Sequence, residues 1–323
     1  MEQQSFSEKL IHRERNKKKL LKFANLTFFL GPFFVSFIVL FLFPFVLGII
    51  MAFSKFDGSS FMPTTFVGLD NFRALFTNPV LIKDFWGSVW NTIKFALVIV
   101  PLSLLIPFGL AMLIRQKPPG YKLFRALIYI PGIFPLTATG IILLKMFSYQ
   151  NGFINNFFDI AVDWFGNTGS AWFMVGLFCI WGGIGTNFII YSAGLENVDK
   201  SLYEASRVDG SNKWRQFITI TIPGVRYQIL LTLFTTFIGF MNLFGQLFIL
   251  TSNTPNQDAM KSAVFRIQDM LMGSSRAFGF AAAMGICLGL IIAVISITQI
   301  IVTRDTKGGN KHVTAFMAWK KSQ

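Results

Sequence analysis

The sequence contains few of the residues from which catalytic and metal sites are usually built. Its 323 residues include only two cysteines, Cys179 and Cys287, and two histidines, His12 and His312. Both cysteines lie within long apolar stretches, where a thiol is more often a small packing group than half of a disulfide or a metal pair. Both histidines lie in polar segments near the ends of the chain. We therefore expect no metal site and no histidine-based catalytic triad.

Charge is also scarce. Charged residues make up 14% of the chain, whereas soluble domains carry about 25%. Six largely apolar stretches have the length, about 20 residues, that crosses roughly 30 Å of hydrocarbon. They are 26–53, 92–114, 125–147, 171–194, 228–250 and 277–303. The first is too long for a cleavable signal peptide. The sequence predicts an all-α membrane protein with six transmembrane helices at 26–303, between a basic segment, 1–25, and a tail, 304–323.

The cations are distributed asymmetrically along the chain. Of 29 Lys and Arg residues, 21 lie in the two terminal segments, in 115–125 or in the central loop 195–226. Because cytoplasmic connections are rich in Lys and Arg, this pattern predicts cytoplasmic termini and a cytoplasmic central loop. The net charge of +14 follows from that topology, and nucleic-acid binding is not expected, since no basic face interleaved with aromatics occurs elsewhere. Segment 1–25 is either a surface helix attracted to membrane lipid or a frayed tail.

Two further absences concern the driving force. The chain lacks the G-x-x-x-x-G-K-[ST] phosphate-binding pattern, so it is expected neither to hydrolyse ATP nor to be an enzyme. No Asp, Glu, Lys or Arg lies near the middle of any predicted span, although proton- and ion-coupled transporters usually need such groups or unwound ion sites. Energy for transport would therefore come from another polypeptide. The alternatives are a secondary transporter or channel, and a membrane scaffold.

The central loop is far longer than a connection between two spans requires, and its pattern predicts two short helices. Ser201 and Glu204 have the spacing of a capping box, in which each side chain meets a backbone N–H of the first turn. A helix is therefore expected over about 202–209. Gly210 follows, and glycine enters a left-handed turn without steric cost. A second helix, with apolar residues at helical spacing, then ends at Pro223.

The run YEASRVDG, followed after a spacer by ITIP, resembles the EAA signature of the permease subunits of ABC importers. Ser206 replaces the second alanine of that signature, and Ile222 replaces a leucine. The resemblance implies that this loop is a coupling helix that docks in a cleft of an ATP-hydrolysing subunit. The alternative is a solvated loop that packs only on its own protein. The residues to which the resemblance assigns coupling are Tyr203, Glu204, Ala205, Ser206, Asp209, Gly210 and Pro223.

The resemblance extends from about Phe23 to Arg304 and includes the stretches FVGLDNFRALFTNP and RALIYIPGIFPLTATGII, which are similar to the carbohydrate branch. It implies the type I ABC importer permease fold, in a bacterial cytoplasmic membrane. The implied partners are a second and usually different permease subunit, two ATPase subunits that hold ATP and Mg, and an extracellular or periplasmic solute-binding protein. No cofactor is expected in this chain. The implied function is ATP-driven, binding-protein-dependent sugar import, with glycerol phosphate or another polyol as the alternative cargo.

Prolines, glycines and amides interrupt the predicted spans. Pro101 and Pro107 in the second span and two prolines in the third predict kinks, which neighbours or cavities must satisfy. Gly/Pro-interrupted spans mark binding regions in transporters. The glycines of IWGGIGTNFII in the fourth span either let helices approach closely or leave space for a ligand. Asn242 and Gln246, one turn apart in the fifth span, either bond between helices or contact a polar substrate.

By resemblance, the family's substrate positions also fall near Leu136 and Leu243. The residues that we expect along the substrate path are Gly132, Trp181, Gly183, Thr236, Phe240, Asn242 and Gln246. Outside the membrane, Asp70 and Asn71 should begin a short helix that Pro79 stops. The loops 54–91 and 251–276 are expected to receive the binding protein.

Overall fold

The computed structural model describes Lys22, residues 26–58, Pro63 and residues 65–251, 260–273 and 277–321, with side chains as far as Arg304. The predicted segment 1–25 therefore lies almost wholly outside the described residues, as does part of the loop 251–276. The regular structure of the described chain is helical apart from one short antiparallel pair of strands, in which Ser54 lies opposite Phe66. The label η marks π-helical or 3-10 turns.

In chain order the elements are η1 (Ile38–Leu42), α2 (Phe43–Ala52), β1 (Ser54–Lys55), β2 (Thr65–Phe66), α3 (Asp70–Thr77), α4 (Pro79–Leu81), η2 (Ile82–Trp86), α5 (Gly87–Arg115), α6 (Tyr121–Tyr129), η3 (Ile130–Ile133), α7 (Leu136–Met146), α8 (Phe153–Phe158), α9 (Thr168–Glu196), α10 (Lys200–Val208), α11 (Lys213–Gln216), η4 (Phe217–Thr221), α12 (Ile222–Gly224), α13 (Arg226–Met241), α14 (Gly245–Thr251), α16 (Ala263–Met272) and α17 (Phe278–Lys321).

Six segments of the described chain have the length and composition of membrane spans. Four of them are unbroken helices: Leu26–Ala52, Pro79–Arg115, Thr168–Glu196 and Phe278–Arg304. The other two are bent pairs, Tyr121–Ile133 with Leu136–Met146 (98°) and Lys213–Gly224 with Arg226–Met241 (65°). The six-span prediction is thus confirmed in number when each bent pair counts as one span. The third and fifth spans, however, are not straight.

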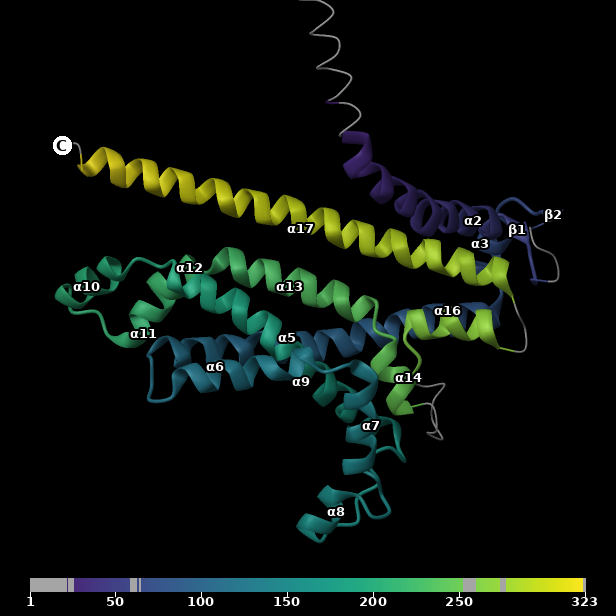
Figure 1. Cartoon of the computed structure of the whole chain (residues 1–323), viewed down its shortest axis with the longest axis horizontal. Coiled ribbons are helices and arrows are strands. Elements are labelled where there is room, and N and C mark those ends of the chain that lie inside the picture. The colour runs from purple at the N-terminus through teal and green to yellow at the C-terminus, as the bar shows by residue number, and fades with distance from the viewer. Residues whose placement is uncertain are drawn as a thin grey trace, which may run out of the picture.

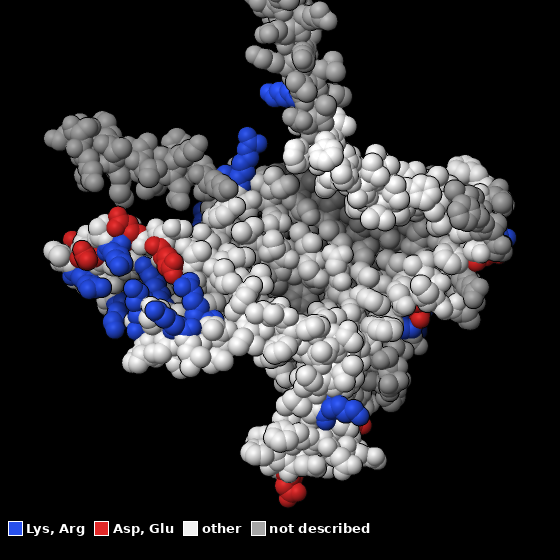
Figure 2. All heavy atoms as spheres, in the orientation of Figure 1, with Lys and Arg blue, Asp and Glu red and all other residues white. Residues whose placement is uncertain are grey.

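The helices run roughly side by side between two ends of the molecule (Figure 1). The first end is formed by the loop 115–125 and by α10 and α11, and Lys and Arg side chains gather there in Figure 2. We call it the charged end. The opposite end carries α2, α3 and α16, while α7 turns away from the bundle and bears α8 at its tip. Helix α17 runs from the opposite end toward the charged end (Figure 1).

The first span is the least buried of the six. No residue in its apolar window is buried inside the chain, and it meets the remainder mainly where α2 packs on α17. Its exposed face carries a ladder of phenylalanines, Phe33, Phe37, Phe41 and Phe45, with neighbouring ring centroids 6.2, 5.1 and 6.2 Å apart. Four-residue spacing places these rings on one side of the helix. This span therefore offers its apolar surface to lipid or to another chain.

Proline in the second span frees a carbonyl that a neighbouring helix uses. Pro107 has no N–H, so the carbonyl of Ser103, four residues earlier, loses its helical partner. Asn187 of α9 donates its Nδ2 to that carbonyl at 3.0 Å and also to the Thr236 hydroxyl at 3.2 Å. The prediction that a neighbour satisfies the freed group is confirmed at Pro107. One amide thereby connects α5, α9 and α13.

The expected short helix of the outer loop is α3, which begins at Asp70 and ends at Thr77. Pro79 follows as the first residue of the next helix, because a proline at that position sacrifices no hydrogen bond. The second span consequently begins near residue 79 and not near residue 92.

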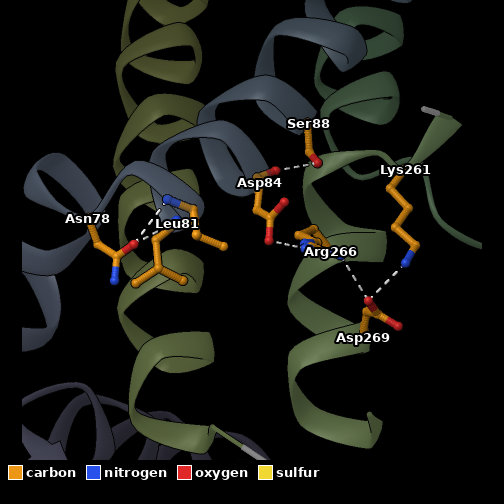
Figure 3. A network of polar contacts seen from close by, with 8 residues as sticks. Asn78, Leu81, Asp84, Ser88, Lys261, Arg266 and Asp269 are labelled. Carbon is orange, nitrogen blue, oxygen red and sulfur yellow. Dashed lines mark hydrogen bonds and ion pairs between the residues drawn. The ribbon is translucent and has the colours of Figure 1, made fainter. Parts of the chain in front are cut away.

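Ion pairs connect this early part of the second span to α16 (Figure 3). Asp84 of η2 pairs with Arg266 of α16. Asp269, one turn further along α16, accepts from Arg266 at 3.1 Å and from Lys261 at 2.9 Å. The Arg266 side chain is only 16% exposed and Asp84 25%, so the pair is largely shielded from water and fixes α16 against the start of the second span.

Candidate functional site

A cavity of about 440 Å³ opens between α5, η3, α7, α9, α13 and α14. Its size lies within the range of small-ligand pockets, which is roughly 300–1,000 Å³. The broken spans form much of its wall: Pro131 and Gly132, before the 98° bend of the third span, and Leu136, after it, are all lining residues. The lining residues are Ser103, Pro131, Gly132, Phe134, Leu136, Thr139, Phe178, Cys179, Gly182, Gly183, Thr186, Asn187, Thr235, Thr236, Gly239, Phe240, Leu243 and Gln246.

The lining combines hydroxyls and amides with aromatic rings, and none of these lining residues is charged. Ser103 is one of the lining residues, and its hydroxyl is buried without a hydrogen-bond partner among the described residues. A buried hydroxyl without a partner carries a desolvation cost that a bound polar group would remove. The cavity is therefore chemically suited to an uncharged ligand that carries several hydroxyls, since amides bond to hydroxyls and rings pack on C–H faces.

The glycines of the fourth span differ in their surroundings, and that one of them leaves space for a ligand stays a prediction. Gly182 and Gly183 line the cavity, and a Cβ added at either would meet nothing within 4 Å. Gly185 instead faces the backbone of Tyr129, where a Cβ would lie 3.0 Å from Tyr129 Cα. The first two glycines therefore create space, and Gly185 allows α9 and α6 to approach closely.

The fifth span is broken where the sequence predicts one continuous helix. Helix α13 ends at Met241 and α14 begins at Gly245, so Asn242 does not lie one helical turn from Gln246, and that expectation was wrong. A break leaves carbonyls without helical partners. Ser262, the N-cap of α16, donates to one of them, the Leu243 oxygen. The ion pairs of Arg266 hold α16 in place, and Ser262 of α16 in turn holds the Leu243 carbonyl. The cavity wall at Leu243 is therefore positioned by contacts made at the opposite end of the molecule.

The expected path residues divide between three places. Gly132, Gly183, Thr236, Phe240 and Gln246 line the 440 Å³ cavity, and their role in transport stays a prediction.

Trp181 lines a separate apolar cavity of about 340 Å³, which shares Phe134 and Thr139 with the first. Asn242 is absent from the lining of both cavities, and its Nδ2 donates to the Ile238 carbonyl at 3.0 Å. Sequence reasoning missed Asn187 and Ser103. Asn187 could have been found, since it is an amide within an apolar span like Gln246.

The central loop forms two helical segments with a glycine elbow, as predicted. Gly210 has a φ of +75°. Two hydrogen bonds close the end of α10 around it, from Gly210 N to Arg207 O (3.0 Å) and from Ser211 N to Ser206 O (2.9 Å), the pattern of a Schellman motif. The second helical segment ends at Gly224, directly after Pro223.

The start of α10 differs from the prediction. Asp199 is the N-cap and accepts from Ser201 N at 2.9 Å, and the helix runs over Lys200–Val208. The predicted capping box, with Ser201 as the cap, is therefore wrong. An Asp at the cap also places a carboxylate at the positive end of the helix dipole, which favours it over a serine two residues later.

Tyr203 anchors α10 to the bundle. Its hydroxyl accepts from Arg115 Nη1 at 3.0 Å and lies 2.9 Å from the Thr221 hydroxyl. The Arg115 guanidinium also lies 4.9 Å from the centroid of the Tyr203 ring, within cation–π range. Glu204, Ala205 and residues 207–210 are exposed in this chain. One face of α10 thus packs on α5, and the other is exposed.

The family model described as binding-protein-dependent transport system inner membrane component matches residues 105–308, a range that contains the central loop and every lining residue of the cavity except Ser103. The chain belongs to this family. Among curated relatives of this permease is the arabinooligosaccharides transport system permease protein AraP of Bacillus subtilis (strain 168). It is 28% identical over 287 residues, which cover 87% of the present chain and 88% of the relative.

A second relative is the lactose transport system permease protein LacF of Rhizobium radiobacter, 29% identical, with 86% of this chain and 94% of the relative covered. A crystal structure of a bacterial ABC transporter involved in the import of the acidic polysaccharide alginate contains a similar chain. That chain has a TM-score of 0.75 and 20% sequence identity, over 90% of the permease described here and 99% of the other chain. The fold is therefore that of a type I ABC importer permease.

Proposed function

We propose that this permease is one membrane-spanning subunit of an ATP-driven, binding-protein-dependent carbohydrate importer, and that the 440 Å³ cavity is part of the sugar path. The observation that carries the proposal is the lining, which offers amides, hydroxyls and aromatic rings without a charged group among the residues named for it. Relatives named for arabinooligosaccharide and lactose transport support the substrate class. An uncharged lining favours a neutral sugar over a glycerol phosphate.

The central loop is the segment to which we assign coupling. Its exposed side, with Glu204, Ala205, Asp209 and Gly210, is free in this chain to enter a cleft of an ATPase subunit, and Tyr203 ties that helix to α5. ATP and Mg would be held by the ATPase subunits, and this permease would be non-catalytic. The charged end then faces the cytoplasm of a bacterial cell, as the positive-inside rule requires.

Two further partners are part of the proposal. The phenylalanine ladder of the first span would pack against a second permease subunit. A binding protein would dock at the opposite end, where 54–58 and α3 lie. A solved alginate transporter in complex with its periplasmic protein offers an analogy for that arrangement. Crosslinks from the binding protein that reach only α10 or 115–125 would contradict the orientation.

Filling the cavity tests the proposal. Gly183→Leu places a side chain in open space at the lining, and we expect assembly to be retained while ATP-driven sugar uptake into proteoliposomes is lost. Gly109→Leu is the matched control, because a Cβ at Gly109 also meets nothing within 4 Å but Gly109 lies outside the lining. Equal uptake by both variants would refute this path. Uptake by the permease without its ATPase would establish a secondary transporter instead.

A further inference from the structure

A second polar cavity lies at the charged end and shares no lining residue with the 440 Å³ cavity. Its volume is about 320 Å³, and it is enclosed by the end of α5, the turn into α6, the end of α9 and the start of α10. Part of its wall is apolar. Its charged lining residues are Arg115, Lys117, Arg125, Glu196 and Lys200, and Ser192 also lines it. We call this the basic cavity.

The charges that line the basic cavity do not balance. It has four cations and one carboxylate. Arg125 pairs with that carboxylate, on Glu196, at 3.2 Å. Arg115, Lys117 and Lys200 form no ion pair with a carboxylate among the described residues. Three positive charges therefore line one partly open cavity of about 320 Å³, and their mutual repulsion favours an anion between them.

A buried hydroxyl without a partner lies in a residue of the same lining and is a second observation beside the charges. Ser192 is 6% exposed, and its Oγ has no hydrogen-bond partner in the part of the chain that the structure describes. A donor left unpaired in a buried position is costly. The rule that cytoplasmic segments are rich in Lys and Arg explains cations on a surface. It does not explain the unpaired buried serine or the apolar residues of the same lining.

We propose that the basic cavity binds a phosphate ester, with the phosphate oxygens held by Lys117, Lys200 and Arg115 and by the Ser192 hydroxyl. Phosphate oxygens accept several charge-assisted hydrogen bonds at once, which suits three cations and a hydroxyl. The phosphate can belong to the headgroup of an anionic lipid, since basic pockets between helices at a membrane surface bind such headgroups, or to a small soluble phosphate. The apolar wall, which includes Ile114 and Val198, favours the lipid.

A ligand in the basic cavity would also contact the start of the coupling loop. Arg115 both lines the cavity and donates to Tyr203 of α10, and Lys200 is the first residue of α10. A phosphate bound to both residues would connect α5 to the start of α10. By linkage, whatever fixes α10 would then strengthen phosphate binding, and the reverse.

The test uses the assembled transporter, purified in detergent with the full chain. Its melting temperature is titrated with dioctanoyl phosphatidylglycerol, with dioctanoyl phosphatidylcholine and with inorganic phosphate. We expect a saturable rise with the anionic lipid and little change with the zwitterionic one. The variant Lys117→Gln/Lys200→Gln should weaken the lipid effect roughly 30-fold, since each cation contributes about fivefold to binding an anionic headgroup. Lys122→Gln, an exposed cation of α6 outside the cavity lining, is the matched control.

Each outcome decides the proposal. Saturable binding that the double variant loses and the control keeps supports the basic cavity, and native mass spectrometry should then find phosphatidylglycerol retained by the wild type and lost by the double variant. The same pattern with inorganic phosphate alone supports the cavity with a soluble anion as its ligand. A wild-type response that is absent, or that both variants retain or lose equally, overturns the proposal. Ser192→Ala removes no charge and should weaken binding severalfold. It therefore distinguishes a specific binding site from nonspecific electrostatic attraction.

Discussion

Replacing Gly210 tests whether the elbow after α10 determines coupling. Its φ of +75° costs a non-glycine residue about 1–2 kcal/mol, and β-branched side chains more. A Cβ at this position would meet no heavy atom of the described chain within 4 Å. Inside this chain the penalty is therefore backbone strain and not a clash. If that strain destabilises α10 in the position in which it docks on the ATPase subunit, Gly210→Val should reduce uptake about five- to thirtyfold or more.

A graded series separates strain from contact with the ATPase. Asn tolerates the left-handed region, so Gly210→Asn should transport close to the wild-type rate, whereas Gly210→Ala should be impaired and Gly210→Val more so. Should Asn be as harmful as Ala, the side chain must collide with a partner wall at the elbow. All variants should still reach the membrane, because the spans do not depend on this turn.

The assay measures sugar uptake, ATPase rate and retention of the ATPase subunit on the same reconstituted complex. Loss of uptake with continued hydrolysis would indicate uncoupling, and loss of the subunit would indicate failed docking. Gly210→Val with all three quantities unchanged would refute the assignment of coupling to this loop.

Three further changes follow from the contacts. Gln246→Leu should lower sugar uptake about tenfold without affecting assembly, since it removes an amide from the cavity. Asn242→Leu, outside the lining, should leave uptake unchanged. Equal effects of the two substitutions would place the path elsewhere. Asp84→Asn removes one of the carboxylates that pair with the shielded Arg266 and leaves Asp269 in place. It should destabilise the complex by about 2 kcal/mol, measured by thermal unfolding; no change in stability would mean that the Asp84–Arg266 pair is not structural. Tyr203→Phe removes a hydroxyl with two partners and should cost about 1–2 kcal/mol in ATPase retention; unchanged binding of the ATPase would show that α10 is held by other contacts.

Features that depend on neighbouring residues along the chain could be predicted from the sequence. The length of an apolar stretch is such a feature, and the first, fourth and sixth spans agree with their helices within a few residues. The preference of glycine for a left-handed turn is another, and Gly210 adopts it. At the start of α10 two local signals competed, and the carboxylate of Asp199 prevailed over the serine.

Which side chains line the cavity depends on which helices pack against one another. No pattern within α5 reveals that the carbonyl freed by Pro107 is met by Asn187, 84 residues away. Trp181 and Gly183 are two residues apart in the sequence, yet they line different cavities, because a helix turns successive side chains in different directions. The sequence by itself thus determined the spans, the elbow and the membrane class, since apolar length and turn preference are local properties. Only the tertiary structure decided which side chains share a cavity, because that depends on the angles and breaks at which distant helices pack.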